Sequence, residues 1–92
     1  MTLDPIYLAN PDVVYRREDD EAIVYHPESG DVKLLNRTSA FVFRLLDGRR
    51  RLSEITAMVA REYDGADPQE VRADIDDFIK IMVNQGFILI VA

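Results

Sequence analysis

The sequence predicts an α+β fold of the winged helix-turn-helix type, with a three-stranded antiparallel sheet followed by three helices. Two observations lead to this prediction. Short β-prone runs separated by turn-forming residues occupy positions 13–35, and apolar residues at helical spacing occupy positions 39–85. A third observation, the continuous apolar run 87–91, indicates an extra C-terminal strand. With 92 residues and no repeated unit, residues 1–92 are expected to form a single domain.

The strands are expected at residues 13–17, 22–25 and 32–35, and the connections between them are short enough for hairpins. Residues 1–12 contain two prolines and are expected to form an irregular arm. In such a meander each outer strand keeps one open row of backbone N–H and C=O groups. The arm or the run 87–91 is expected to cover one of these edges.

Each helix has local signals at its ends. Polar residues 36–38 precede the first helix, expected at 39–46, and Ser53 is the expected N-cap of the second. The third begins with the sequence Asp67-Pro68-Gln69-Glu70, which combines a capping carboxylate, a first-position proline and a glutamate suited to a capping box. Gly86 ends it. A tight junction at 47–49 completes the helix-turn-helix pattern.

The composition disfavours several classes of function. Seventeen acidic side chains against 11 basic ones give a net charge of −6, which repels nucleic-acid phosphates. No apolar run is long enough to span a membrane, and the N-terminus lacks the basic start of a signal peptide, so a cytoplasmic location is expected.

Catalytic and metal-binding residues are not apparent. The chain has no cysteine, and its one histidine, His26, lies in a turn without an acid placed to orient it. The acidic run 18–21 lacks the ligand spacing of a calcium loop and is interpreted as a solvated hairpin tip. We therefore expect no enzyme activity, no cofactor and no metal.

The third strand, Asp31 to Leu35, is the best candidate for a binding edge, because Lys33 is the only side chain in the run 32–35 that discourages pairing. Asp74, Asp77 and Ile81 share one side of the third helix and could form the wall of a groove beside it. Two alternatives stay open. The acidic flank of this helix simply faces water, or the strand edge is closed by a homodimer.

Several short segments together resemble the PqqD-like proteins. The order and spacing of these segments carry the resemblance, which runs from about residue 8 to residue 88: Leu8-Ala9-Asn10-Pro11-Asp12-Val13, Gly30-Asp31-Val32-Lys33-Leu34-Leu35-Asn36-Arg37-Thr38-Ser39-Ala40, Leu46-Asp47-Gly48 and Gly86-Phe87. That family includes the peptide chaperone of pyrroloquinoline quinone biosynthesis and the recognition domains of ribosomally made, modified peptides.

The resemblance implies a leader-peptide-binding chaperone. In this family the leader of a precursor peptide adds to the third strand, lies in the cleft beside the third helix, and is presented to a modifying enzyme, often a radical S-adenosylmethionine enzyme. Carried over to this chain, the binding residues are Asp31, Val32, Lys33, Leu34 and Leu35 on the strand and Asp74, Asp77, Phe78 and Ile81 on the helix.

Two rival functions remain. A winged-helix transcriptional regulator would use the third helix to bind DNA, but that helix is predominantly acidic. A dimeric interaction subunit would use the strand edge and the apolar tail 89–91, which extends beyond a minimal family member and is compatible with a swapped dimer.

Overall fold

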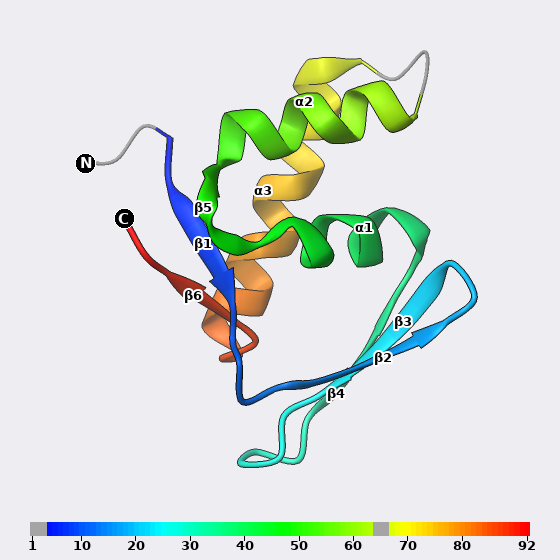
Figure 1. Cartoon of the computed structure of the whole chain (residues 1–92), viewed down its shortest axis with the longest axis vertical. Helices are drawn as coiled ribbons and strands as arrows, with labels where there is room; N and C mark the ends of the chain where they lie inside the picture. The colour runs from blue at the N-terminus through cyan, green and yellow to red at the C-terminus, as the bar shows by residue number, and fades with distance from the viewer. Residues whose placement is uncertain (1–3, 64–66) are drawn as a thin grey trace.

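The computed structural model of the chain describes residues 4–63 and 67–92. Its elements follow one another in the order β1 (Ile6–Ala9), β2 (Val14–Glu18), β3 (Glu21–Tyr25), β4 (Val32–Leu35), α1 (Arg37–Leu45), β5 (Asp47–Arg51), α2 (Leu52–Glu62), α3 (Pro68–Asn84) and β6 (Ile88–Ile90). The strands form two sheets, ordered β2-β3-β4 and β5-β1-β6. Figure 1 shows the three helices beside both sheets. The predicted α+β fold is confirmed.

The sheet β2-β3-β4 is the predicted antiparallel meander. β2 pairs with β3 from Val14↔Tyr25 to Glu18↔Glu21, and β3 pairs with β4 from Ala22↔Leu35 to Tyr25↔Val32. The second hairpin turns at Gly30, which has a φ of 81° and donates its N–H to the carbonyl of His26 at 2.8 Å. Glycine adopts this left-handed conformation without steric cost.

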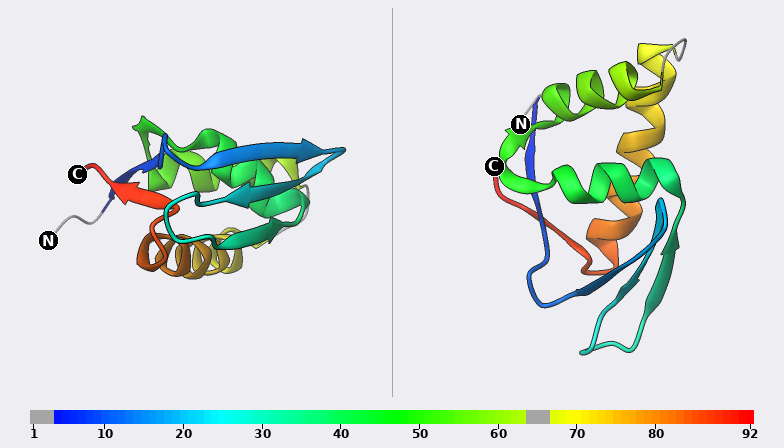
Figure 2. Two further views of the ribbon diagram at one scale, coloured as in Figure 1. Left: turned by 90° about the horizontal axis from the view of Figure 1, so that it is seen from below. Right: turned by 45° about the vertical axis from the view of Figure 1, so that its right-hand side comes forward.

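The N-terminal arm differs from the prediction, because residues Ile6–Ala9 form the central strand of the second sheet. β1 pairs with β6, the predicted C-terminal strand, from Tyr7↔Ile90 to Ala9↔Ile88. The expectation that the arm or the tail covers an edge of the meander is therefore wrong. The two segments satisfy each other's backbone groups instead, and this pairing separates them from the sheet β2-β3-β4 (Figure 2).

The predicted tight junction after the first helix is also wrong, since residues Asp47–Arg51 form β5 and pair with β1. The Asp47 carboxylate accepts the N–H groups of Arg49 and Arg50, each at 2.9 Å. This local bond turns the chain into the strand, and β1 supplies the partner that the local sequence does not reveal.

The N-terminus of α2 lies earlier than predicted, because Arg51 rather than Ser53 occupies the N-cap position. Ser53 donates its backbone N–H and its hydroxyl to the Asp4 carboxylate at 2.8 and 2.6 Å. Two carboxylates thus satisfy this helix end: that of Glu54, which accepts the Arg51 N–H at 3.0 Å, and that of Asp4, which is distant in the sequence.

α3 begins at the predicted N-cap and proline, but among the described residues Glu70 does not complete the predicted capping box. Asp67 is its N-cap and accepts the N–H of Gln69 at 2.9 Å, with Pro68 in the first turn. Its buried residues Ile75, Ile79 and Met82 face the rest of the core. That core also contains Val24 and Leu35 from the meander, Val42 and Phe43 from α1, Ile55 and Val59 from α2, and Phe87 and Ile88 from the C-terminal segment.

Candidate functional site

The outer edge of β4 is open among the described residues. β4 pairs with β3 on one side, and no described strand pairs with its other side. A strand edge of this kind presents backbone donors and acceptors that can pair with another chain. The edge expected to be under-protected is therefore available in the monomer.

The register identifies which backbone groups face this edge. His26 donates its N–H to the carbonyl of Asp31 at 2.9 Å, so these two residues form a hydrogen-bonded pair of the ladder. Such pairs alternate with non-hydrogen-bonded pairs in an antiparallel ladder. Following the register, Lys33 and Leu35 direct their N–H and C=O groups to β3, whereas those of Val32 and Leu34 point to the open edge.

Along β4, exposed side chains alternate with side chains that are buried or half-buried. Leu35 is 3% exposed and belongs to the core, whereas Leu34 is 80% and Val32 55% exposed on the opposite face. Lys33 is half-buried and lies on the same side of the sheet as Leu35. Asp31, the residue before the strand, is exposed.

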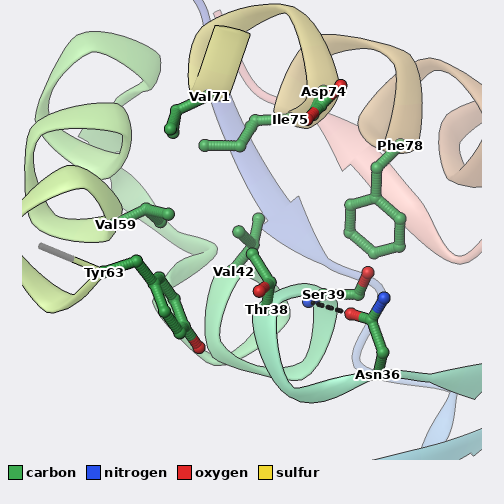
Figure 3. A pocket seen from close by; sticks show the side chains of 10 residues that line it. All are labelled: Asn36, Thr38, Ser39, Val42, Val59, Tyr63, Val71, Asp74, Ile75 and Phe78. Carbon is green, nitrogen blue, oxygen red and sulfur yellow. Dashed lines mark hydrogen bonds between the residues drawn. The ribbon is translucent and has the colours of Figure 1, made fainter. Parts of the chain in front are cut away.

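A pocket of about 500 Å³ lies between α1, α2 and α3, and it begins at the residue that follows β4. Figure 3 shows Phe78 extending from α3 toward Asn36 and the first turn of α1, with Tyr63 of the α2 C-terminus on the other side. The lining is apolar on the inside and polar at the rim: Val42, Val59, Val71, Ile75 and Phe78 with Asn36, Thr38, Ser39, Tyr63 and Asp74. A concave apolar site with a few polar groups is typical of ligand binding.

Local interactions hold the rim in place. The side chain of Asn36 accepts the backbone N–H of Ser39 at 2.8 Å, which caps α1 as predicted. The ring of Tyr63 packs edge-on against Phe41 with centroids 6.3 Å apart, and the Arg37 guanidinium lies 5.6 Å from its centroid. Both ends of the pocket are thus held by contacts between residues close to the start of α1 and the end of α2.

The predicted site residues separate into two groups. Asp74 and Phe78 line the pocket, and β4 leads into it through Asn36. Asp77 and Ile81 are exposed on α3 and do not line it. Asp74 forms no ion pair with a described residue, whereas the neighbouring Asp76 pairs with Lys80 at 2.9 Å. The rim therefore carries a carboxylate, that of Asp74, without an ion-pair partner among the described residues.

Other pocket residues were not predicted as site residues. Val59 and Val71 follow the apolar stripes of their helices, so the sequence indicates only that they belong to the core. Asn36 and Ser39 were interpreted as capping residues, and they serve the cap and the rim together. Tyr63 gives no sequence signal for this role, because its place depends on how α2 packs against α1.

The described residues contain no group of three or more histidine, cysteine, aspartate or glutamate side chains placed to hold a metal ion. His26 is 9% exposed and packs edge-on against Phe87 with centroids 5.7 Å apart. None of the helices that the structure describes is long and apolar enough to cross a bilayer.

Two solved structures are similar to this chain over most of its length. TbiB1 in complex with the TbiA(beta) leader peptide is 26% identical, with a TM-score of 0.80 over 88% of this chain and 93% of that one. Lasso peptide synthetase B1 complexed with the leader peptide is 18% identical and has the same fold, with a TM-score of 0.78 over 90% of this chain and 96% of that one. No curated protein matches the sequence.

The sequence also matches a family model, that of Coenzyme PQQ synthesis protein D (PqqD), over residues 21–88. The match extends from β3 to the start of β6, so it includes β4 and all three helices. This is the part of the chain that forms the open edge and the pocket. The chain belongs to the PqqD family.

Proposed function

We propose that this protein is a leader-peptide-binding chaperone, which captures a ribosomally made precursor peptide by strand addition and presents it to a modifying enzyme. The observation that carries the proposal is the open edge of β4 beside an apolar pocket. The similar structure of TbiB1 contains a leader peptide, which supports the same kind of ligand here. The protein itself then needs no catalytic group, cofactor or metal.

In the proposed complex the peptide pairs with the backbone groups of Val32 and Leu34 and extends the sheet β2-β3-β4 by one strand. Side chains alternate along the added strand, so every second one points to the side of the sheet that faces the helices. Phe78 and Asp74 would contact these side chains at the pocket. Asp77 and Ile81 would extend the wall along α3.

Backbone pairing gives affinity with limited dependence on sequence, and the pocket gives selectivity. The unpaired carboxylate of Asp74 would favour a peptide with a lysine or arginine beside this residue of the rim.

Presentation to the enzyme needs no further chemistry in this protein. A peptide held by its leader keeps its other end at an effective concentration in the millimolar range near an enzyme bound to the same complex. A radical S-adenosylmethionine enzyme is the proposed partner, as the family resemblance implies. The complex would form in the cytoplasm, where ribosomal precursors are made.

Amide hydrogen exchange tests the proposal directly. Isotope-labelled protein is titrated with synthetic fragments of a candidate precursor peptide. We expect the amides of Val32 and Leu34 to become protected on binding, because they face the open edge. The amides of Lys33 and Leu35 already pair with β3 and serve as the control within the same strand.

The rival functions predict other results. A DNA-binding regulator would show salt-sensitive binding to duplex DNA and no protection at β4. A dimeric interaction subunit would protect Val32 and Leu34 without peptide, at protein concentrations at which it sediments as a dimer. Saturated peptide binding without protection of these two amides would show that strand addition is the wrong mode.

A further inference from the structure

The face of the sheet β2-β3-β4 that points away from the core carries several exposed apolar side chains on the side nearest β4 and the hairpin turn at Gly30. Val14 of β2, Tyr25 of β3 and Val32 of β4 are cross-strand neighbours, and they are 53%, 40% and 55% exposed. The next set of cross-strand neighbours contains Arg16, which is exposed, Ile23, which is half-buried, and Leu34, which is 80% exposed. We call the side chains of Val32 and Leu34, which neighbour each other along β4 on this face, the outer apolar row.

The position of this row relates it to the binding edge. Val32 and Leu34 are the two residues of β4 whose backbone groups face the edge. In an antiparallel addition, the peptide residues directly opposite them have their side chains on the same outward face. Those side chains would lie against Val32 and Leu34, on the opposite side of the peptide from the pocket.

We propose that the outer apolar row is a second specificity-determining surface, which selects apolar residues at alternate positions of the bound peptide. This inference rests on the proposed function, because it assumes that a peptide adds to β4. It assigns the class of ligand more narrowly: an extended segment with apolar side chains on both faces. β-branched and aromatic residues are preferred opposite Val32 and Leu34, since such cross-strand pairs are favourable.

The residues around Val32 and Leu34 explain why we expect an apolar side chain of the bound peptide to pack against them. Toward β3, the cross-strand neighbours of Leu34 and Val32 are Ile23 and Tyr25. Toward the open edge, no described residue covers Leu34. A strand added to the edge occupies that side. A charged peptide residue there would lose water to apolar neighbours without gaining a partner.

Lys33 lies on the opposite face of β4 from Val32 and Leu34. It lies between Val32 and Leu34 but on the inner side of the sheet, so the peptide residue opposite it faces α3 and the pocket. Two independent preferences are therefore expected along the peptide, at alternating positions. One depends on pocket residues such as Phe78, and the other depends on Leu34 and Val32.

A peptide selection tests this inference. A library of randomised ten-residue peptides is selected for binding to the wild-type protein. Peptides that also bind the L34P variant are then discarded, so that only ligands of the β4 edge remain. We expect apolar residues both at the peptide positions that face the pocket and at the positions that face Val32 and Leu34. The same library is then selected on L34E and on V14E, a matched variant on the same face but two strands from the edge.

For L34E we expect lysine and arginine to replace apolar residues at one outward position, while the pocket-facing positions keep their preference. V14E adds the same charge and should leave the wild-type profile unchanged. For a single selected peptide, L34A should weaken binding about two- to fivefold and V14A should not. Because Leu34 is largely exposed, all these variants should fold, which circular dichroism checks.

Three results would overturn the inference. An unchanged profile for L34E, with pocket-facing preferences intact, would refute the outer row and leave the proposed function standing. A change in sedimentation between wild type and L34E, without a change in the profile, would assign the row to self-association. Failure of the wild-type protein to enrich any edge-binding peptide would refute the proposed function and the inference with it.

Discussion

The side chain of Asn36 accepts a hydrogen bond from the backbone N–H of Ser39 at 2.8 Å, and both residues line the pocket. Asn36 directly follows β4, so one residue ends the binding strand, caps α1 and forms the rim. The position of the strand edge relative to the pocket therefore depends on a single short connection.

Replacing Asn36 with alanine should destabilise the protein by about 1 kcal/mol, the usual cost of losing an N-cap. For a domain of this size, that lowers the melting temperature by about 4–8 °C. Thermal unfolding followed by circular dichroism measures the change. N36S is the matched control, because serine can also accept the Ser39 N–H; equal melting temperatures for N36A and wild type would show that the cap is unimportant.

Two proline substitutions in β4 should have opposite effects. L34P removes an N–H that faces the open edge, so it should keep a melting temperature close to wild type and weaken peptide binding at least tenfold. K33P removes an N–H that pairs with β3, so it should lower the melting temperature. Calorimetric titration and thermal unfolding of both variants measure these effects. Normal peptide binding by folded L34P would contradict strand addition.

Phe78 should contribute more to peptide binding than Ile81, although both lie on α3. Phe78 lines the pocket, whereas Ile81 is 56% exposed and outside it. We expect F78A to weaken the binding of precursor fragments about tenfold or more, since buried aromatic contacts dominate interface energies. I81A should weaken it about threefold or less if the peptide extends along the helix. Fluorescence anisotropy with a labelled fragment separates the two, and a larger effect of I81A would move the site along α3.

Asp4 should stabilise the fold in a pH-dependent manner. The Ser53 hydroxyl, and then its backbone N–H, lower the pKa of the Asp4 carboxyl below its usual value. This stabilisation is present above the pKa of an unfolded aspartate, near 3.9, and is lost as the pH falls through the lower pKa of the folded state. D4N should therefore melt below wild type at pH 7, and the difference should shrink below about pH 4.

The control for Asp4 is D12N, which removes an exposed carboxylate whose side chain accepts no hydrogen bond in the structure's described part. Thermal unfolding from pH 7 to pH 2.5 is measured for wild type, D4N and D12N. A constant difference between wild type and D4N across this range would show that the charged carboxylate is not what stabilises α2.

Local patterns were sufficient to predict the meander, the caps of α1 and α3, and the open edge of β4. Each depends on residues a few positions apart, such as Asn36 with Ser39 or Asp67 with Gln69. β1 and β5 were missed because their pairing joins distant segments, as in Leu8↔Asp47 and Leu8↔Leu89. Neither strand has a recognisable partner in its own part of the chain.

The site was predicted in part for the same reason. Helical periodicity grouped Asp74 with Asp77 and Ile81, whereas Phe78 became a candidate through the family resemblance. Of these residues only Asp74 and Phe78 line the pocket. Tyr63 and Val59 reach it only because α2 packs beside α1 and α3, and sequence periodicity does not determine that packing angle. The assignment of Leu34 and Val32 to the open side of the ladder also required the observed register of β3 and β4 and the hydrogen bond between His26 and Asp31.

The pairing of β1 with β6 also determines how the molecule can be attached to a surface or to another protein. Ile6 donates its N–H to the carbonyl of Ala92 at 3.0 Å, so the beginning of β1 and the last residue lie together. In Figure 1 the C-terminus lies at the left of the molecule, and β4 lies at the lower right. An immobilisation tag or a fused protein joined beside Ala92 would therefore leave the edge and the pocket accessible to ligands.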